Sequence, residues 1–294
     1  MIRRDLLAEI RVSLSDKSGL RLQEAEFQGP EGEVLRSGLV RSDSTGETYR
    51  IRPGYLDLLG KNSAVRNVAN LSNYLPGAGA AYEPLWRVRS LDLLTGEKFS
   101  NQREVQKIAE MLRITDGSGA DTGERRSERH SERRYLDLGC SAGLYTRELA
   151  RLLGASGHVV GVDISPSMLR QAARNCEAAG VEASLLRADA ESLPFAPESF
   201  DGVLCGGSLN EFGNPGRALA EAARVLKPGG RIAIMGLLKS DTPRGSLAQR
   251  FLNTGGAQFF STSGIREMLS EAGLTPEELE TYGGVFFAAA LKES

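Results

Sequence analysis

A glycine-containing turn is the strongest chemical signal in the chain. It runs Asp137-Leu138-Gly139-Cys140-Ser141-Ala142-Gly143, between an expected strand and an expected helix. Glycine has no Cβ, so the backbone of such a turn can approach a ligand closely. Its glycines sit at positions 1 and 5 with Ser141 in the middle, which differs from the dinucleotide fingerprint G-x-G-x-x-G. The turn predicts a ligand site; a tight strand-to-helix turn without a ligand is the alternative.

A carboxylate follows the next expected strand. Asp163 comes 20 residues after Gly143 and ends the apolar run 158–162. A carboxylate at this place can accept hydrogen bonds from ribose hydroxyls, although acidic residues in such turns also cap helices. Ile164 and Met168 could sandwich an adenine ring, with helix packing as the alternative for Met168.

The third expected strand ends in Asp189-Ala190. The carboxylate of Asp189 could accept a hydrogen bond from an exocyclic amine, while the next backbone N–H donates to a ring nitrogen. Ligands of open α/β sheets bind beyond the carboxyl ends of the strands. Features at several neighbouring strand ends therefore predict a nucleoside site.

The elements that position these residues follow from hydrophobic patterning. Apolar runs that predict strands alternate with amphipathic helices from residue 134 onward, at 135–138, 158–162, 183–186, 202–205 and 232–238. Ser165-Pro166 and Asn214-Pro215 each place a capping residue before a proline at the first helical position. Gly283-Gly284 predicts a terminal hairpin, which we prefer to the helix that a capping box at 275–278 would start. Apolar strands alternating with helices predict an α/β fold with a parallel sheet covered on both faces.

The sequence divides into four parts. Residues 1–60 predict a small β module, with strands at 10–14, 19–22, 34–40 and 48–51. Residues 61–115 predict a helical lid segment, with a helix that begins near Asn101. Residues 116–133 are dense in Arg and Glu and predict a polar linker, with an RNA-contacting arm as the alternative. Residues 134–294 form the expected main domain.

Composition excludes several classes of protein. The 294 residues carry 36 Lys and Arg against 38 Asp and Glu, a net charge of −2, which argues against bulk capture of nucleic acid. No apolar run approaches the ~20 residues of a membrane helix, and the N-terminus lacks the apolar core of a secretory signal. Cys140, Cys176 and Cys205 are scattered without a C-x-x-C pair, so we expect neither a zinc ribbon nor a disulfide framework. A cytoplasmic protein is expected.

Several stretches together resemble class I S-adenosylmethionine-dependent methyltransferases: 135–146, 159–169, 186–195, 199–204 and 225–234. The stretches 186–195 and 224–230 look most like the branch that includes quinone-biosynthesis methyltransferases. The resemblance covers roughly residues 134–292. It implies S-adenosylmethionine as cofactor and a seven-stranded Rossmann-like sheet whose last strand is antiparallel.

The resemblance also implies a role for individual residues. The turn that begins at Asp137 would hold the methionine part, Asp163 the ribose, and Asp189 and Ala190 the adenine. Within that turn, the methionine part would be cradled by Gly139, Cys140, Ser141 and Gly143. The methyl-transfer face would be lined by Cys205 and Gly206. The family usually has glycine at position 141. A serine there costs little if its φ is negative, so we expect binding to survive.

The front of the chain carries a second resemblance. Residues 38–40 and 46–59 are similar to a zinc-ribbon-like module that precedes some ribosomal-RNA guanine methyltransferases and some plastid methyltransferases. The metal cysteines of that module are absent here, so we expect no metal. Residues 82–99 and the helix after Asn101 resemble the segment that closes over the cofactor in such enzymes.

Methyl transfer is an in-line displacement at an activated sulfonium, so positioning and water exclusion supply much of the catalysis. An acidic phenol, enol or carboxylate acceptor demands no strong base, and we assign no catalytic residue. His158 is expected to be packed inside a strand. The (N/D)-P-P-(Y/F) motif of amino-group methyltransferases is missing after the fourth strand.

Candidates for the acceptor side come from two parts of the chain. Tyr74, Tyr82 and Trp86 could form an aromatic lid or anchor the lid to the main domain. Asn210 and Glu211 could face an acceptor or lie in a solvated loop.

The sequence thus predicts a methyltransferase that modifies oxygen or carbon of a small molecule. An rRNA or tRNA methyltransferase and a non-catalytic cofactor-binding scaffold are the alternatives. A nicotinamide-dependent oxidoreductase is disfavoured by the glycine spacing. Neither the acceptor nor the oligomeric state follows from the sequence.

Overall fold

The structure is a computed structural model that describes residues 2–3, 5–8, 10, 20–28, 34–60, 98–114, 133–254 and 256–293. The C-terminal part supplies the strands β6 (Arg133–Leu138), β7 (Gly157–Asp163), β8 (Ser184–Arg187), β9 (Phe200–Gly206), β10 (Leu226–Leu237), β11 (Thr275–Tyr282) and β12 (Val285–Leu291). The N-terminal part supplies β1 (Ile2–Arg3), β2 (Leu20–Gln28), β3 (Val34–Ser42), β4 (Thr48–Arg52) and β5 (Tyr55–Asp57).

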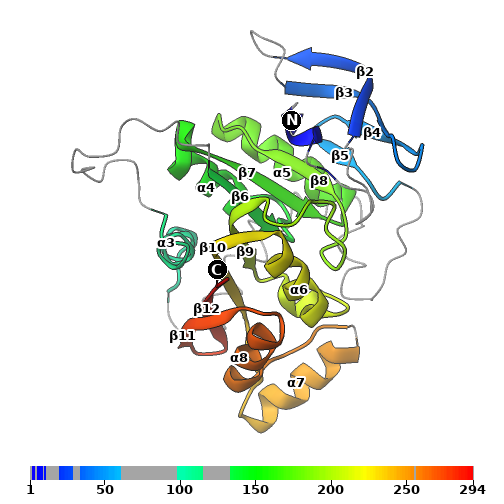
Figure 1. Ribbon diagram of the computed structural model, residues 1–294. Helices are drawn as coiled ribbons and strands as arrows, with labels where there is room; N and C mark the ends of the chain where they lie inside the picture. The colour runs from blue at the N-terminus through cyan, green and yellow to red at the C-terminus, as the bar shows by residue number, and fades with distance from the viewer. Residues whose placement is uncertain are drawn as a thin grey trace, which may run out of the picture.

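These strands form one 12-stranded mixed sheet (Figure 1). Its order is β1-β3-β4-β5-β8-β7-β6-β9-β10-β12-β11, and β2 pairs with β3 outside this path. The strands from β8 to β10 are parallel, while β12 is antiparallel to both β10 and β11. The α/β fold and the antiparallel last strand are confirmed. The predicted count of seven is not, because β5 pairs with β8 and carries the N-terminal strands into the same sheet.

Helices cover both faces of the sheet, as predicted. The longer ones are α3 (Asn101–Met111), α4 (Leu144–Leu153), α5 (Pro166–Ala179), α6 (Pro215–Val225), α7 (Pro243–Thr254) and α8 (Thr262–Glu271). Side chains of β6, β9 and β10 on one face form a buried cluster with α3 and α4. The opposite face of the same strands packs against α6 and α8.

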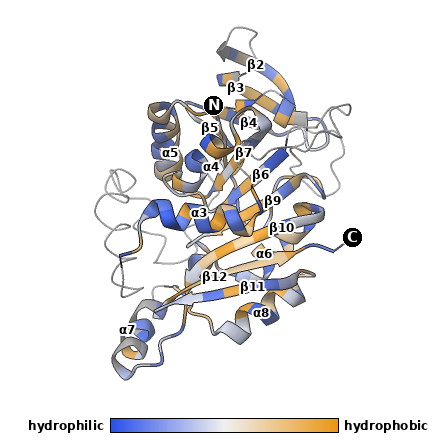
Figure 2. Ribbon diagram, turned by 90° about the vertical axis from the view of Figure 1, so that its left-hand side faces the viewer, coloured by the Kyte–Doolittle hydropathy of each residue, from blue (hydrophilic) through white to orange (hydrophobic). Residues whose placement is uncertain are grey.

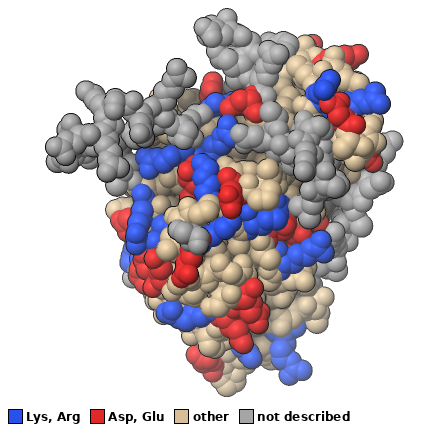
Figure 3. Space-filling model, viewed as in Figure 1, with Lys and Arg blue, Asp and Glu red and all other residues tan. Residues whose placement is uncertain are grey.

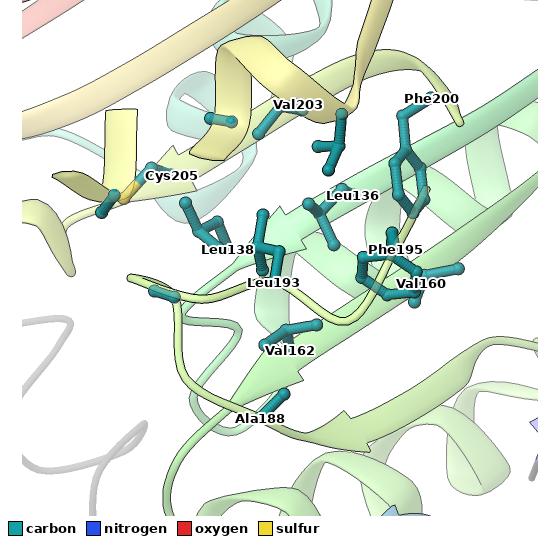
Figure 4. Close-up of a cluster of buried hydrophobic side chains, with 14 of the residues drawn as sticks. Leu136, Leu138, Val160, Val162, Ala188, Leu193, Phe195, Phe200, Val203 and Cys205 are labelled. Atoms are coloured by element: carbon teal, nitrogen blue, oxygen red, sulfur yellow. The ribbon is translucent and has the colours of Figure 1, made fainter. Parts of the chain in front are cut away.

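The second buried cluster also includes the segment that follows β8. Leu193 lies beside Leu138 and Phe195 beside Val160 in this cluster (Figure 4). The rings of Phe195 and Phe200 meet edge to face, with centroids 4.9 Å apart. The segment after β8 therefore shields these strand residues from solvent without forming a helix.

Capping residues fix where the helices begin. Ser165 and Asn214 cap α5 and α6 ahead of the predicted prolines, and Ser100 caps α3. α3 packs against β10, β12 and α4, and its residues Val105 and Ile108 are buried. The rest of the predicted lid and linker, 61–97 and 115–132, lies outside the described residues.

The terminal hairpin is present as predicted. β11 and β12 pair in register from Thr275 opposite Leu291 to Tyr282 opposite Val285. Figure 2 shows β12 coloured largely as hydrophobic and the edge strand β11 with hydrophilic residues, in agreement with their burial. Alternate residues of β12 join the buried clusters on the two faces of the sheet, so both of its faces are buried. The β-prone run 285–291 therefore prevails over the capping box at 275–278.

The sequence analysis missed α7, whose hydrophobic residues lack a strong one-sided pattern. None of the helices in the described residues has both the length and the hydropathy of a membrane-spanning helix. On the described part of the face in Figure 3, acidic and basic side chains are interspersed.

Candidate functional site

The glycine turn joins β6 to α4 at the carboxyl end of the sheet. The backbone N–H groups of Gly139 and Cys140 both donate to the carbonyl of Val162, at 2.8 and 2.9 Å. Three turn residues have left-handed backbone conformations: φ is 73° at Gly139, 49° at Ser141 and 79° at Gly143. The expectation of a negative φ at Ser141 is therefore wrong, and the serine adopts a conformation that costs an L-residue about 1–2 kcal/mol.

The glycines are required first by the packing of the protein itself. A Cβ at Gly139 would lie 2.5 Å from Cβ of Ser208, and one at Gly143 would lie 2.9 Å from Cβ of Ala172 in α5. The hydroxyl of Ser208 also donates to the carbonyl of Gly139 at 2.7 Å. The loop after β9 thus contacts the turn directly, a contact that no sequence signal indicated.

Asp163 holds the turn against the end of β7. Its Oδ2 accepts from the N–H of Ser141 at 2.8 Å, and its Oδ1 accepts from the N–H of Ser165 at 2.7 Å. Burial raises the pKa of this carboxyl, and the hydrogen bonds from these amides only partly oppose that effect. The side chain keeps some exposure to solvent. The glycine turn and the Asp163 carboxylate therefore lie side by side, as expected from their neighbouring strands.

The two predicted adenine-contacting residues differ in exposure. Met168 is 2% exposed, and its sulfur accepts from the hydroxyl of Ser141 at 3.6 Å, so it packs against the turn. Ile164 is half-buried, and its carbonyl accepts from Nε of Arg187 at 3.1 Å. The packing alternative describes Met168 in this structure, and Ile164 is the more accessible of the two.

Asp189 and Ala190 form a compact turn after β8. Oδ1 of Asp189 accepts from the N–H of Glu191 at 3.0 Å, and its carbonyl accepts from the N–H of Ser192 at the same distance. Asp189 is half-buried and Ala190 is buried. Because β8 pairs with β7, this turn lies beside the end of β7, which carries Asp163.

At the end of β9, Cys205 and Gly206 are both buried. Burial raises the pKa of the Cys205 thiol to about 12, so this group does not ionise near neutral pH. A Cβ at Gly206 would lie 1.8 Å from the ring of Tyr145, whose hydroxyl donates to the buried carboxyl of Glu104. Tyr145 belongs to α4, and no sequence signal indicated its contact with the predicted methyl-transfer face.

Asp137 and Cys140 support the turn from within. Asp137 is 1% exposed and accepts from the hydroxyl of Thr146 at 2.5 Å, which ties β6 to α4. Cys140 belongs to a buried cluster with Leu169 and Leu185, and burial raises the pKa of its thiol well above the ordinary value. Both side chains are buried and support the turn without facing a ligand.

The structure separates the predicted acceptor-side residues. Asn210 is 3% exposed; its amide donates to the carbonyls of Leu237 and Gln258, and its Oδ1 accepts from the N–H of Leu237. It therefore braces loops and does not face an acceptor. Glu211 is half-buried and remains a candidate to face the acceptor. Tyr74, Tyr82 and Trp86 lie outside the described residues.

The described histidine is structural, as expected. His158 is buried and its Nε2 lies 2.9 Å from the hydroxyl of Ser184 on the neighbouring strand. The three cysteines are free and buried. In the part of the chain that the structure describes, no three His, Cys, Asp or Glu side chains gather as a metal site.

Comparison with known proteins agrees with this geometry. Residues 136–234 match a family model described as methyltransferase domain. A demethylmenaquinone methyltransferase of Thermus thermophilus is 40% identical over 106 residues, 35% of this chain and 46% of that protein. A 2-phytyl-1,4-naphtoquinone methyltransferase of Synechocystis is 38% identical over 120 residues, 40% of this chain and 49% of that protein. The matched segment thus spans less than half the length of these relatives.

Solved structures share the fold over a longer stretch. A Haloferax volcanii complex between the Trm112 methyltransferase activator and a methyltransferase aligns with a TM-score of 0.55 and 18% identity. The alignment covers 79% of this chain and 100% of that chain. The comparisons confirm a methyltransferase domain in residues 136–234 and indicate S-adenosylmethionine as its cofactor.

Proposed function

We propose that this chain is an S-adenosylmethionine-dependent methyltransferase that modifies oxygen or carbon of a small-molecule acceptor. The observation that carries the proposal is the hydrogen bond from the N–H of Ser141 to Oδ2 of Asp163, at 2.8 Å. It holds a main-chain turn and a carboxylate together at the ends of two adjacent parallel strands. Both residues lie within the segment that matches the methyltransferase domain.

The residues at this edge of the sheet fit the cofactor. The carboxylate of Asp163 accepts from the N–H groups of Ser141 and Ser165, and the backbone amide of Ile164 also stabilises its charge. A carboxylate offers about four acceptor positions, so one remains that suits a ribose hydroxyl. Asp189 and the N–H of Ala190 would address the adenine, and the backbone at Gly139 the methionine part. The strand order brings these groups to one edge of the sheet, where open α/β sheets bind their ligands. When bound, the cofactor supplies a methyl group on a sulfonium.

The protein would act mainly by positioning the acceptor and excluding water. Because the pKa of Cys205 is raised to about 12, this thiol does not serve as a base at neutral pH. Glu211, on the loop after β9, is the candidate to receive a proton or to orient the acceptor. The names of the relatives support a quinol or phenol as acceptor class.

Calorimetry with S-adenosylhomocysteine tests the proposal. The wild-type protein should bind it, and Asp163→Ala should weaken binding by at least about tenfold, because hydrogen bonds to a charged acceptor contribute about 1.5–3 kcal/mol. Glu271→Ala removes an exposed carboxylate at the end of α8, away from the carboxyl ends of the parallel strands, and should leave binding unchanged. Absence of binding by the wild type at millimolar ligand would refute the proposal. Incubation with labelled cofactor and a panel of phenols, quinols and fatty acids then identifies the acceptor.

A further inference from the structure

The N-terminal strands contact the main domain through β5. Leu56 and Asp57 of β5 pair in parallel with Leu186 and Arg187 of β8, and the two strands lie side by side in Figure 1. Arg187 is the last residue of β8, two positions before the turn of Asp189 and Ala190. The segment 54–60 therefore borders the end of the sheet at which the nucleoside site is proposed.

Arg187 joins the two parts through its side chain. The residue is 6% exposed. Its Nη1 donates to Oδ1 of Asp57 at 3.1 Å and to the carbonyl of Gly60 at 2.7 Å. On the other side, Nε donates to the carbonyl of Ile164 at 3.1 Å. One planar group thus spans from the N-terminal segment to the residue after Asp163.

Asp57 fixes the guanidinium in this direction. The carboxylate is 4% exposed, and its Oδ1 also accepts from the N–H of Gly60 at 3.0 Å. Its Oδ2 accepts from Nε of Arg52 at 2.9 Å. A buried ion pair costs desolvation energy that close geometry and further hydrogen bonds must offset, and this pair has both.

The backbone completes the link to Asp163. The N–H of Ala188 donates to the carbonyl of Asp163 at 3.2 Å, and the N–H of Leu58 donates to the carbonyl of Arg187 at 3.1 Å. We propose that Arg187 and Asp57 are positioning residues, which hold the backbone at 163–164 so that the Asp163 carboxylate faces the nucleoside of the cofactor. This inference rests on the proposed function.

Tyr55 supplies a second contact in the same direction. It is 2% exposed and lies in the buried cluster that contains Cys140 of the glycine turn and Leu169 of α5. Gly54 is equally close to α5, because a Cβ on it would lie 2.5 Å from Cβ of Ala173. The N-terminal segment thus packs against the glycine turn and α5, which flank the proposed cofactor site.

Arg187→Lys is the sharpest variant. Lysine keeps a positive charge for Asp57, but its ammonium cannot also hold Ile164 in the planar geometry of a guanidinium. The dissociation constants of S-adenosylhomocysteine and of methylthioadenosine, which lacks the amino-acid part, should both rise about tenfold and by the same factor. Amide exchange of Ser141 and Ser165, both donors to Asp163, should accelerate.

Arg52→Lys is the matched control, because Arg52 is a half-exposed partner of the same Asp57. It should leave both dissociation constants unchanged. Asp57→Asn is a second variant with the expected signature of Arg187→Lys, should the latter fold poorly. Wild-type affinity in both Arg187→Lys and Asp57→Asn, or a loss confined to S-adenosylhomocysteine, would overturn the inference while the proposed function stands. A wild-type protein that binds neither ligand refutes the proposed function, and this inference with it.

Discussion

The N–H of Ser141 donates to Oδ2 of Asp163 at 2.8 Å across a separation of 22 residues. The carboxylate is therefore part of the turn it faces, and the ends of β6 and β7 are joined by more than their strand pairing. Burial raises the pKa of Asp163 above its ordinary value of 3.8 despite this bond and that from Ser165. Ligand binding and folding should respond to pH in different ways as a result.

The first prediction concerns ligand binding. Affinity for S-adenosylhomocysteine should fall as the pH is lowered through the raised pKa of Asp163, because protonation removes an acceptor for the ribose hydroxyl. The decline should begin at a higher pH than an ordinary aspartate would give. Calorimetry from neutral to mildly acidic pH measures this, and Asp163→Asn should bind weakly without the pH dependence. A variant that keeps the wild-type profile would assign the titration to another group.

The second prediction concerns folding, and its pH dependence is opposite to that of ligand binding: the contribution of Asp163 to the free energy of unfolding falls as the pH rises. A carboxyl whose pKa is higher in the folded than in the unfolded state binds protons more tightly when folded. Its contribution is fully present below pH 3.8 and is lost as the pH rises through the raised folded pKa. Asp163→Asn should thus flatten the stability profile between these two values, as measured by urea unfolding.

Ser141→Gly should stabilise the protein. With φ at 49°, Ser141 has a conformation that costs an L-residue about 1–2 kcal/mol, and glycine is free of this cost but loses more chain entropy on folding. The net gain should be about 1 kcal/mol or less in the free energy of unfolding. Ser141→Ala keeps the strain and loses only the hydroxyl contact to Met168, so it should not be stabilising. Equal stability of the two variants would contradict the strain argument.

The sequence predicted those features of the site that depend only on residues close together in the chain. The caps at Ser165 and Asn214 and the order of strand, turn and carboxylate follow from neighbouring residues, and the structure has them. The glycines at 139 and 143 were explained by ligand approach, but the contacts that exclude a Cβ come from Ser208 and Ala172. Contacts between distant segments leave no periodic signal, which is why these partners and the pairing of β5 with β8 were missed.

Asn210 illustrates the same limit, since a polar residue in a loop gives no sign of burial. Asn210→Ala should lower the free energy of unfolding by about 3 kcal/mol, because it leaves the N–H and carbonyl of Leu237 and the carbonyl of Gln258 without this partner. Chemical denaturation measures the loss. Glu211→Gln, one position away, should change stability little and reduce turnover once an acceptor is found. A neutral Asn210→Ala would show that water replaces the amide.

Tyr145 and Gly206 should be energetically coupled. A Cβ at Gly206 would lie 1.8 Å from the Tyr145 ring, which cannot swing away because its hydroxyl is bonded to the buried carboxyl of Glu104. Gly206→Ala should therefore cost about 1–3 kcal/mol of stability, as overpacking does.

Gly216→Ala is the control for this variant. Gly216 lies in α6, and a Cβ there would make only an ordinary contact, 3.6 Å from the side chain of Asn214, so the change should be neutral or stabilising. In the double variant Gly206→Ala/Tyr145→Ala the new methyl group has room, so its cost should largely vanish in a double-mutant cycle. Additive losses in that cycle would mean that the crowding is relieved elsewhere and that Tyr145 does not shape the end of β9.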